Sequence, residues 1–161
     1  MVSLIFPKQI DNTFRGLWFA IWLLVPIVLA KTAMGANSVF NTRFVATSAD
    51  GIPLDSYNAG AADAVLALFA LLGLCQLILA LLGIVVLIRY RAMIPLMYLL
   101  LLIQQVGSRL VLLVNPIARL GGVQPIGAAI NITILVMLII GFVLSLQSRS
   151  AAQARTGATL G

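Results

Sequence analysis

The stretch that decides the fold is LILALLGIVVLIRYRAMIPLMYLLLLIQQVGSRLVLLV, residues 77–114. Two apolar runs flank the short connection Arg89–Arg91, and each belongs to a stretch that exceeds the roughly 20 apolar residues that a membrane-spanning helix needs. So short a connection predicts two antiparallel helices that are neighbours. The second run also holds the polar series QQVGSR, residues 104–109, which lipid surroundings strongly disfavour.

Two further apolar stretches complete a single transmembrane domain, residues 1–147, with predicted spans at about 16–34, 62–88, 92–114 and 126–146. The composition agrees: 62% of the 161 residues are hydrophobic and 9% are charged, whereas a soluble domain has about a quarter charged residues. The sequence therefore predicts an all-α integral membrane protein built as a four-helix bundle. Residues 148–161 are small, polar and basic, and we expect them to form a disordered cytoplasmic tail.

Lysine and arginine residues near the span ends predict the orientation, because cytoplasmic loops carry an excess of them. The side with both termini holds Lys8, Arg15, Arg89, Arg91, Arg149 and Arg155. The other side holds Lys31, Arg43 and Arg119, with Arg109 just inside the span. We therefore expect a multi-pass protein of a bacterial-type inner (cytoplasmic) membrane, with both termini cytoplasmic. The alternative is a signal peptide that is cleaved after VLA, residues 28–30.

The loop at residues 35–61 is the only long one and is predicted to lie on the outer side. Its Asp50-Gly51 pair is a turn signal between two short β-prone segments, so we expect a short hairpin or lid over the outer face. Asp50 and Asp55 are two acids without the rest of a calcium coordination set. They are therefore weak evidence for a cation site.

Polar residues inside the spans form the candidate site. In a helix, Gln105 and Arg109 lie one turn apart on one face. One interpretation is an arginine that extends to the interface with a glutamine below it. The other is an outer polar cluster, in which Asp63 and Arg109 form an ion pair beside Gln105 and Asn131, with Lys31 nearby.

Small and polar residues recur at helical spacing in two spans, as helix packing in lipid prefers. In the fourth span the stripe includes Gly127, Asn131 and Gly141, and in the second it includes Gly73, Gln76 and Gly83. We expect these positions to be helix-packing sites. Gln76 is a candidate for a hydrogen bond between helices.

Missing residue types exclude several functions. The chain has no histidine, no glutamate and one cysteine, Cys75. These absences rule out a disulfide within the chain, axial histidine ligands for haem, and the paired cysteines of membrane thiol oxidoreductases. They also exclude the membrane-embedded glutamate of small multidrug exporters. We expect no cofactor, no metal and no catalytic residues, and the scattered basic residues argue against nucleic acid.

The leading functional hypothesis is therefore an accessory, assembly or scaffold subunit. Such a protein would have the lipid bilayer around it and other membrane proteins, or copies of itself, as partners. The alternative is a transporter or channel-like protein for a small solute or lipid, which would use the outer polar cluster around Arg109. A lipid-modifying enzyme with Asp63 as its base is a third option, with no second acid or metal set to support it.

Overall fold

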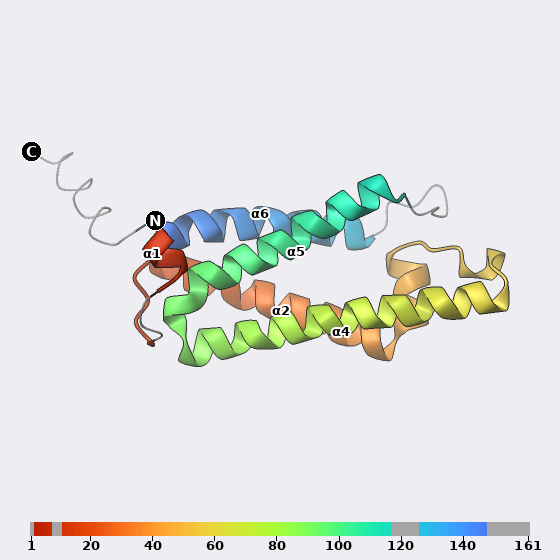
Figure 1. The fold of residues 1–161 in the computed structure, drawn as a ribbon, viewed down its shortest axis with the longest axis horizontal. Helices are drawn as coiled ribbons and strands as arrows, with labels where there is room; N and C mark the ends of the chain where they lie inside the picture. The colour runs from red at the N-terminus through yellow and green to blue at the C-terminus, as the bar shows by residue number, and fades with distance from the viewer. Residues whose placement is uncertain (1, 8–10, 117–125, 148–161) are drawn as a thin grey trace, which may run out of the picture.

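The computed structural model describes residues 2–7, 11–116 and 126–147 (Figure 1). The expected tail at residues 148–161 lies outside this part of the chain. The described residues form helices joined by turns and contain no strand. The helices are α1 Val2–Ile5, α2 Trp18–Phe40, α3 Thr42–Phe44, η1 Val45–Ala49, η2 Leu54–Ser56, α4 Ala59–Arg89, η3 Arg91–Met93, α5 Ile94–Val114 and α6 Ile126–Leu146.

Four of these helices, α2, α4, α5 and α6, are long and apolar enough to cross a membrane, as the sequence predicts. The main difference is in α2, which continues to Phe40 where the prediction ended at Met34. The extra turns begin with four small or polar residues, and they continue the helix because Gly35 packs against the backbone of Leu77 on α4. Helix α4 begins earlier than predicted because the Asn58 side chain accepts a hydrogen bond from the Ala61 N–H at 2.8 Å.

The spanning helices lie roughly along one long axis (Figure 1). We call the end with the α4–α5 connection the turn end, and the end with residues 41–58 the loop end. Helix α2 packs closely along α4, and α6 packs on both α2 and α5. The prediction that α4 and α5 are antiparallel neighbours holds at the turn end, but contacts between them are few and they diverge towards the loop end.

The apolar core lies between α2, α5 and α6 towards the turn end. Its fully buried side chains include Leu24, Tyr98, Leu101 and Leu138. The Tyr98 hydroxyl donates a hydrogen bond to the carbonyl of Ala20 at 2.7 Å, which satisfies the one polar atom of this large side chain. The turn end is therefore filled with side chains.

The predicted helix-packing glycines lie at close contacts within the chain. A Cβ atom at Gly73 would lie 2.5 Å from Cβ of Ser38, and one at Gly83 would lie 2.9 Å from Val28, so both face α2. A Cβ atom at Gly141 would overlap the ring of Tyr98. The surroundings of Gly127 lie outside what the structure describes. Glycine thus lets α4 approach α2, and α6 approach α5, without a cavity or a clash.

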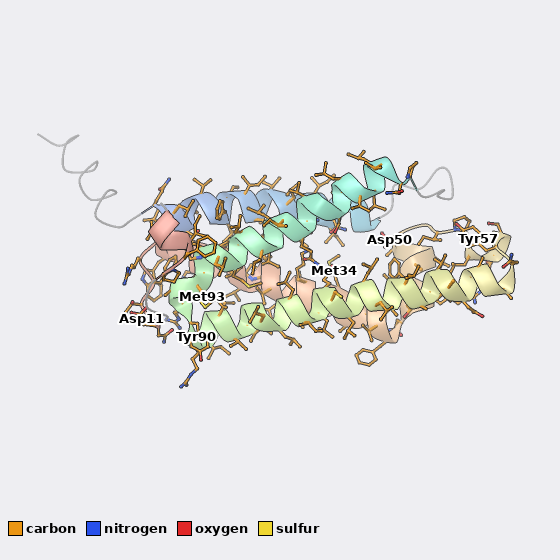
Figure 2. The ribbon with its side chains drawn as sticks, in the orientation of Figure 1. Asp11, Met34, Asp50, Tyr57, Tyr90 and Met93 are labelled. Atoms are coloured by element: carbon orange, nitrogen blue, oxygen red, sulfur yellow. The ribbon has the colours of Figure 1, made fainter. Side chains whose placement is uncertain are left out.

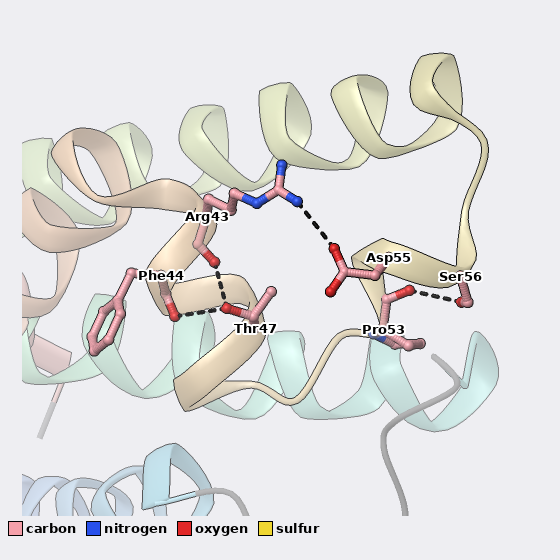
Figure 3. A network of polar contacts seen from close by, with 6 residues as sticks. All are labelled: Arg43, Phe44, Thr47, Pro53, Asp55 and Ser56. Atoms are coloured by element: carbon pink, nitrogen blue, oxygen red, sulfur yellow. Dashed lines mark hydrogen bonds and ion pairs between the residues drawn. The ribbon is translucent and has the colours of Figure 1, made fainter.

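The expected hairpin at Asp50-Gly51 is wrong, because residues 42–58 form helical turns. We call this segment the cap. Gly51 does take a positive φ of 68°, so the predicted turn at this position is correct. The strands that were expected on either side of it do not form. An Arg43–Asp55 ion pair at 3.1 Å crosses the cap, and the Thr47 hydroxyl donates to the Arg43 carbonyl (Figure 3).

Three residues of the cap, Ala46, Ile52 and Leu54, are buried in a second small core. They pack against partly buried side chains that include Leu66 and Phe69 of α4. This contact fixes the cap on the first turns of α4. It also places Asp50 at the mouth of the space between the spanning helices.

Candidate functional site

Each spanning helix contributes a polar residue at a similar height. With a rise of 1.5 Å per residue, Lys31 of α2 and Gln76 of α4 each lie about 20 Å from the turn end. Gln105 of α5 lies about 17 Å from this end, and Asn131 of α6 about 23 Å. A hydrocarbon core is about 30 Å thick. The polar residues therefore form one layer inside the membrane thickness, somewhat nearer to the loop end.

Hydrogen bonds connect three members of this layer. The Lys31 ammonium donates to Oε1 of Gln105 at 2.5 Å and to Oε1 of Gln104 at 3.4 Å. The other end of the Gln105 amide donates to Oδ1 of Asn131 at 3.0 Å and to its carbonyl oxygen at 3.3 Å. Gln105 thus joins α2 to α6 through α5, with its oxygen towards the cation.

Lys31 is the unusual member, because it is a cation that is only 2% exposed. Within the described part of the chain, no carboxylate lies within ion-pair distance of it. Its two acceptors are neutral amides, which solvate the charge without neutralising it. An ammonium group has three N–H bonds, so one donor remains after the contacts to Gln104 and Gln105.

A cavity of about 210 Å³ opens beside this ammonium group. Its polar lining comes mainly from Lys31, Gln104, Gln105, Ser108, Arg109 and Asn131, and α4 adds Leu72 and Gln76. We call it the polar cavity. The half-exposed Arg109 makes no hydrogen bond or ion pair to another described residue, so two cationic side chains face one small space.

Asp50 of the cap is a lining residue that the sequence did not place at this site. It lies at the loop end between α4 and α5 (Figure 2). Its sequence signal was the Asp50-Gly51 turn, which showed a change in chain direction but not where the carboxylate would lie. Gln104 was also missed as a partner of Lys31, since Lys31 was expected near the end of its span.

Asp63, the expected partner of Arg109, is not at this site. It is exposed and does not line the polar cavity. Counting residues along the helices puts it about 16 Å further from the turn end than Arg109. The reason is the length of α4, which carries Asp63 past the ends of the other helices. Among the described residues the one ion pair is Arg43–Asp55.

Of the predicted cluster, then, the structure brings together Lys31, Gln105, Arg109 and Asn131. Gln76 lines the same polar cavity, but no hydrogen bond links it to another helix within the described residues.

Comparisons with family models, curated proteins and solved structures give no match. The function must therefore be argued from the site itself.

An apolar space of about 480 Å³ adjoins the polar cavity. We call it the apolar groove. Its walls are Phe69 and Leu72 of α4, Ile103, Val111 and Leu112 of α5, and Ile52 of the cap, with Gly107 between the α5 side chains. Asp50, Gln104 and Ser108 line both spaces, so the two lie directly beside each other.

The arrangement is suited to binding an anionic group. Two cations and several amide groups face a small polar space in surroundings of low dielectric constant, where a charge-assisted hydrogen bond is strong. Ser108 donates its hydroxyl to the Gln104 carbonyl at 2.7 Å, so it is engaged with its own helix. A small anionic group would supply the negative charge that Lys31 and Arg109 lack.

Proposed function

We propose that this protein binds an anionic solute or lipid headgroup in the polar cavity and acts as a transporter or channel-like protein for it. The observation that carries the proposal is Lys31, a buried cation at the wall of a cavity, whose hydrogen-bond acceptors among the described residues are the amides of Gln104 and Gln105. Burying an ammonium group without a counter-charge is unfavourable, and a bound anion offsets that cost.

The packing around the site supports access from one side. Tyr98, Leu101 and Leu138 fill the turn end, while the polar cavity is lined by Asp50 of the cap at the loop end. A solute would thus reach Lys31 from the loop end or from between α4 and α5. Transport would further require the core at the turn end to open.

Thermal unfolding of the protein in a neutral detergent tests anion binding. The probes are sulfate, glycerol phosphate and phosphatidylglycerol, with choline as a cationic control. We expect at least one of the anions to raise the unfolding temperature, because a ligand at 100 times its Kd stabilises the folded state by about 2.7 kcal/mol. Choline should leave the unfolding temperature unchanged.

Three variants locate the effect. Lys31→Met should weaken the binding of that anion at least about thirtyfold, since truncating one partner of a buried charge pair costs about 2–5 kcal/mol. Arg109→Leu should weaken it about tenfold, in line with its partial exposure. Arg89→Leu changes an exposed arginine at the turn end and should have no effect. The proposal fails if no anion stabilises the protein, or if stabilisation survives in both Lys31→Met and Arg109→Leu.

A second candidate is the accessory or assembly subunit. The observation in its favour is that only 22% of the residues in the most apolar part of α4 are buried within the chain. Most of this helix is therefore left to contact lipid or partner helices. Native mass spectrometry of the protein, extracted gently from its own membrane, distinguishes the two candidates. Another polypeptide at fixed stoichiometry supports the subunit, whereas a lone chain or small homo-oligomer with a bound metabolite or lipid supports transport.

We further propose an inner-membrane location with both termini cytoplasmic and the cap outside, from the distribution of basic residues. Reporter fusions test this topology. Green fluorescent protein at the C-terminus should be fluorescent, and alkaline phosphatase inserted after Ser56 in the cap should be active. The opposite pattern, with an inactive phosphatase at Ser56 and an active one at the C-terminus, would reverse the orientation.

A further inference from the structure

The apolar groove gives the site a second chemical character. A polar cavity alone suits any small anion, but this one adjoins a larger space whose walls are mainly apolar side chains. Leu72 and Leu112 line both spaces, together with the polar groups that join them. A ligand that filled both would need a charged end and an apolar end.

The groove also lies on a side of the molecule that faces the hydrocarbon. Leu72, Ile103 and Val111 are exposed, and α4 and α5 make few contacts with each other. These helices diverge towards the loop end (Figure 1), and the groove lies between them. An acyl chain could therefore stay in the bilayer or the groove while its headgroup entered the polar cavity.

We infer that the ligand is an anionic membrane lipid, with its headgroup against Lys31 and Arg109 and an acyl chain in the apolar groove. This inference rests on the proposed function. The charges favour an anionic headgroup, since Lys31 and Arg109 are two cations in the lining of the polar cavity. The size agrees too, because 210 Å³ holds several water molecules or one phosphate-sized group.

A free inorganic or water-soluble anion would use only half of this site. It would leave the groove walls, including Phe69 and Ile103, without a partner. A helix of another protein could cover the groove, but it would supply an anionic group only if one of its carboxylate side chains reached the polar cavity. A lipid satisfies both halves at once, and the surrounding membrane provides it at high concentration.

The test uses the full chain, stripped of lipid in a neutral detergent, and native mass spectrometry with added ligands. Phosphatidylglycerol is the anionic lipid, phosphatidylcholine is a lipid with the same chains and no net charge, and glycerol phosphate is an anionic group without chains. We expect phosphatidylglycerol to bind at least tenfold more tightly than either of the other two. The difference from phosphatidylcholine reports the headgroup, and the difference from glycerol phosphate reports the chain.

Gly107 allows the groove to be blocked without disturbing the polar cavity. Nothing lies within 4 Å of a Cβ atom built at this position, and Gly107 lines the groove but not the polar cavity. Gly107→Leu should therefore fold normally and weaken phosphatidylglycerol at least tenfold, while it leaves glycerol phosphate unchanged. Gly60→Leu makes the same exchange in α4, outside the groove, and should bind as the unmodified protein does.

Each outcome separates the two proposals. Equal binding of phosphatidylglycerol and glycerol phosphate, or full binding of phosphatidylglycerol by Gly107→Leu, overturns the lipid inference and leaves anion binding intact. Equal binding of phosphatidylglycerol and phosphatidylcholine also overturns the lipid inference, and a preference for phosphatidylglycerol that persists in both Lys31→Met and Arg109→Leu overturns both proposals. Binding of phosphatidylglycerol that Lys31→Met and Gly107→Leu both weaken supports both.

Discussion

We expect Gly141→Ala to lower the free energy of unfolding by about 1–3 kcal/mol, the usual cost of adding a methyl group to a filled core. The methyl group would overlap the ring of Tyr98, which is fully buried. The ring has little freedom to move, because its hydroxyl is hydrogen-bonded to the carbonyl of Ala20. The α5–α6 contact would have to separate to accommodate the methyl group.

Reversible unfolding in mixed detergent micelles measures this effect. Gly107→Ala is the matched control, because the same methyl group meets open space there. Replacing glycine by alanine inside a helix favours the helix by up to about 1 kcal/mol, so the control should be as stable as the unmodified protein or more so. Equal stability of Gly141→Ala and Gly107→Ala would contradict the close contact between Gly141 and Tyr98.

The second large effect is expected for Gln105→Leu. This change removes the nearest acceptor of the Lys31 ammonium and the donor to Asn131. A hydrogen bond to a charged group contributes about 1.5–3 kcal/mol, and we expect a loss of stability of that size. Gln104→Leu is the matched control. Its contact with Lys31 is 3.4 Å long and its side chain is only partly buried, so its cost should stay below about 1 kcal/mol.

A double-mutant cycle identifies the cause of the loss. If Gln105 acts by solvating the cation, Gln105→Leu should cost much less in a Lys31→Met background, because no buried charge remains to be satisfied. The expected coupling is about 1–2 kcal/mol, within the range for residues in direct contact. Strictly additive costs would mean that Gln105 acts mainly through Asn131.

The sequence predicted the elements well because hydrophobic length is a strong signal in membranes. It failed where tertiary contacts determine the boundaries. Residues 35–40 are small and partly polar, and they are helical because Gly35 and Ser38 pack against α4. The cap likewise forms helical turns in place of strands, because Ala46, Ile52 and Leu54 pack on one face of α4.

The candidate site was predicted in part. Lys31, Asp63, Arg109 and Asn131 were grouped from their depth and Gln105 from its helical spacing to Arg109, and this grouping fails only for Asp63. The Asp63–Arg109 pair was inferred from charge balance, which gives neither the length of α4 nor the direction of a side chain. The apolar groove could not be predicted, because it depends on the angle between α4 and α5, and that angle is set by packing against α2 and α6.

The depth of Lys31 also has an electrical consequence. An ammonium group about 20 Å from the turn end lies about one third of the way into a 30 Å hydrocarbon core from the loop end. Moving one charge across the whole core changes its electrostatic energy by about 2.3 kcal/mol per 100 mV. An anion that reaches Lys31 from the loop end crosses about one third of the core, so its energy changes by about 0.8 kcal/mol per 100 mV. Each 100 mV of membrane potential therefore changes the affinity for such an anion about fourfold. Under the proposed function, the occupancy of this site would therefore depend on the membrane voltage, without any change in the protein.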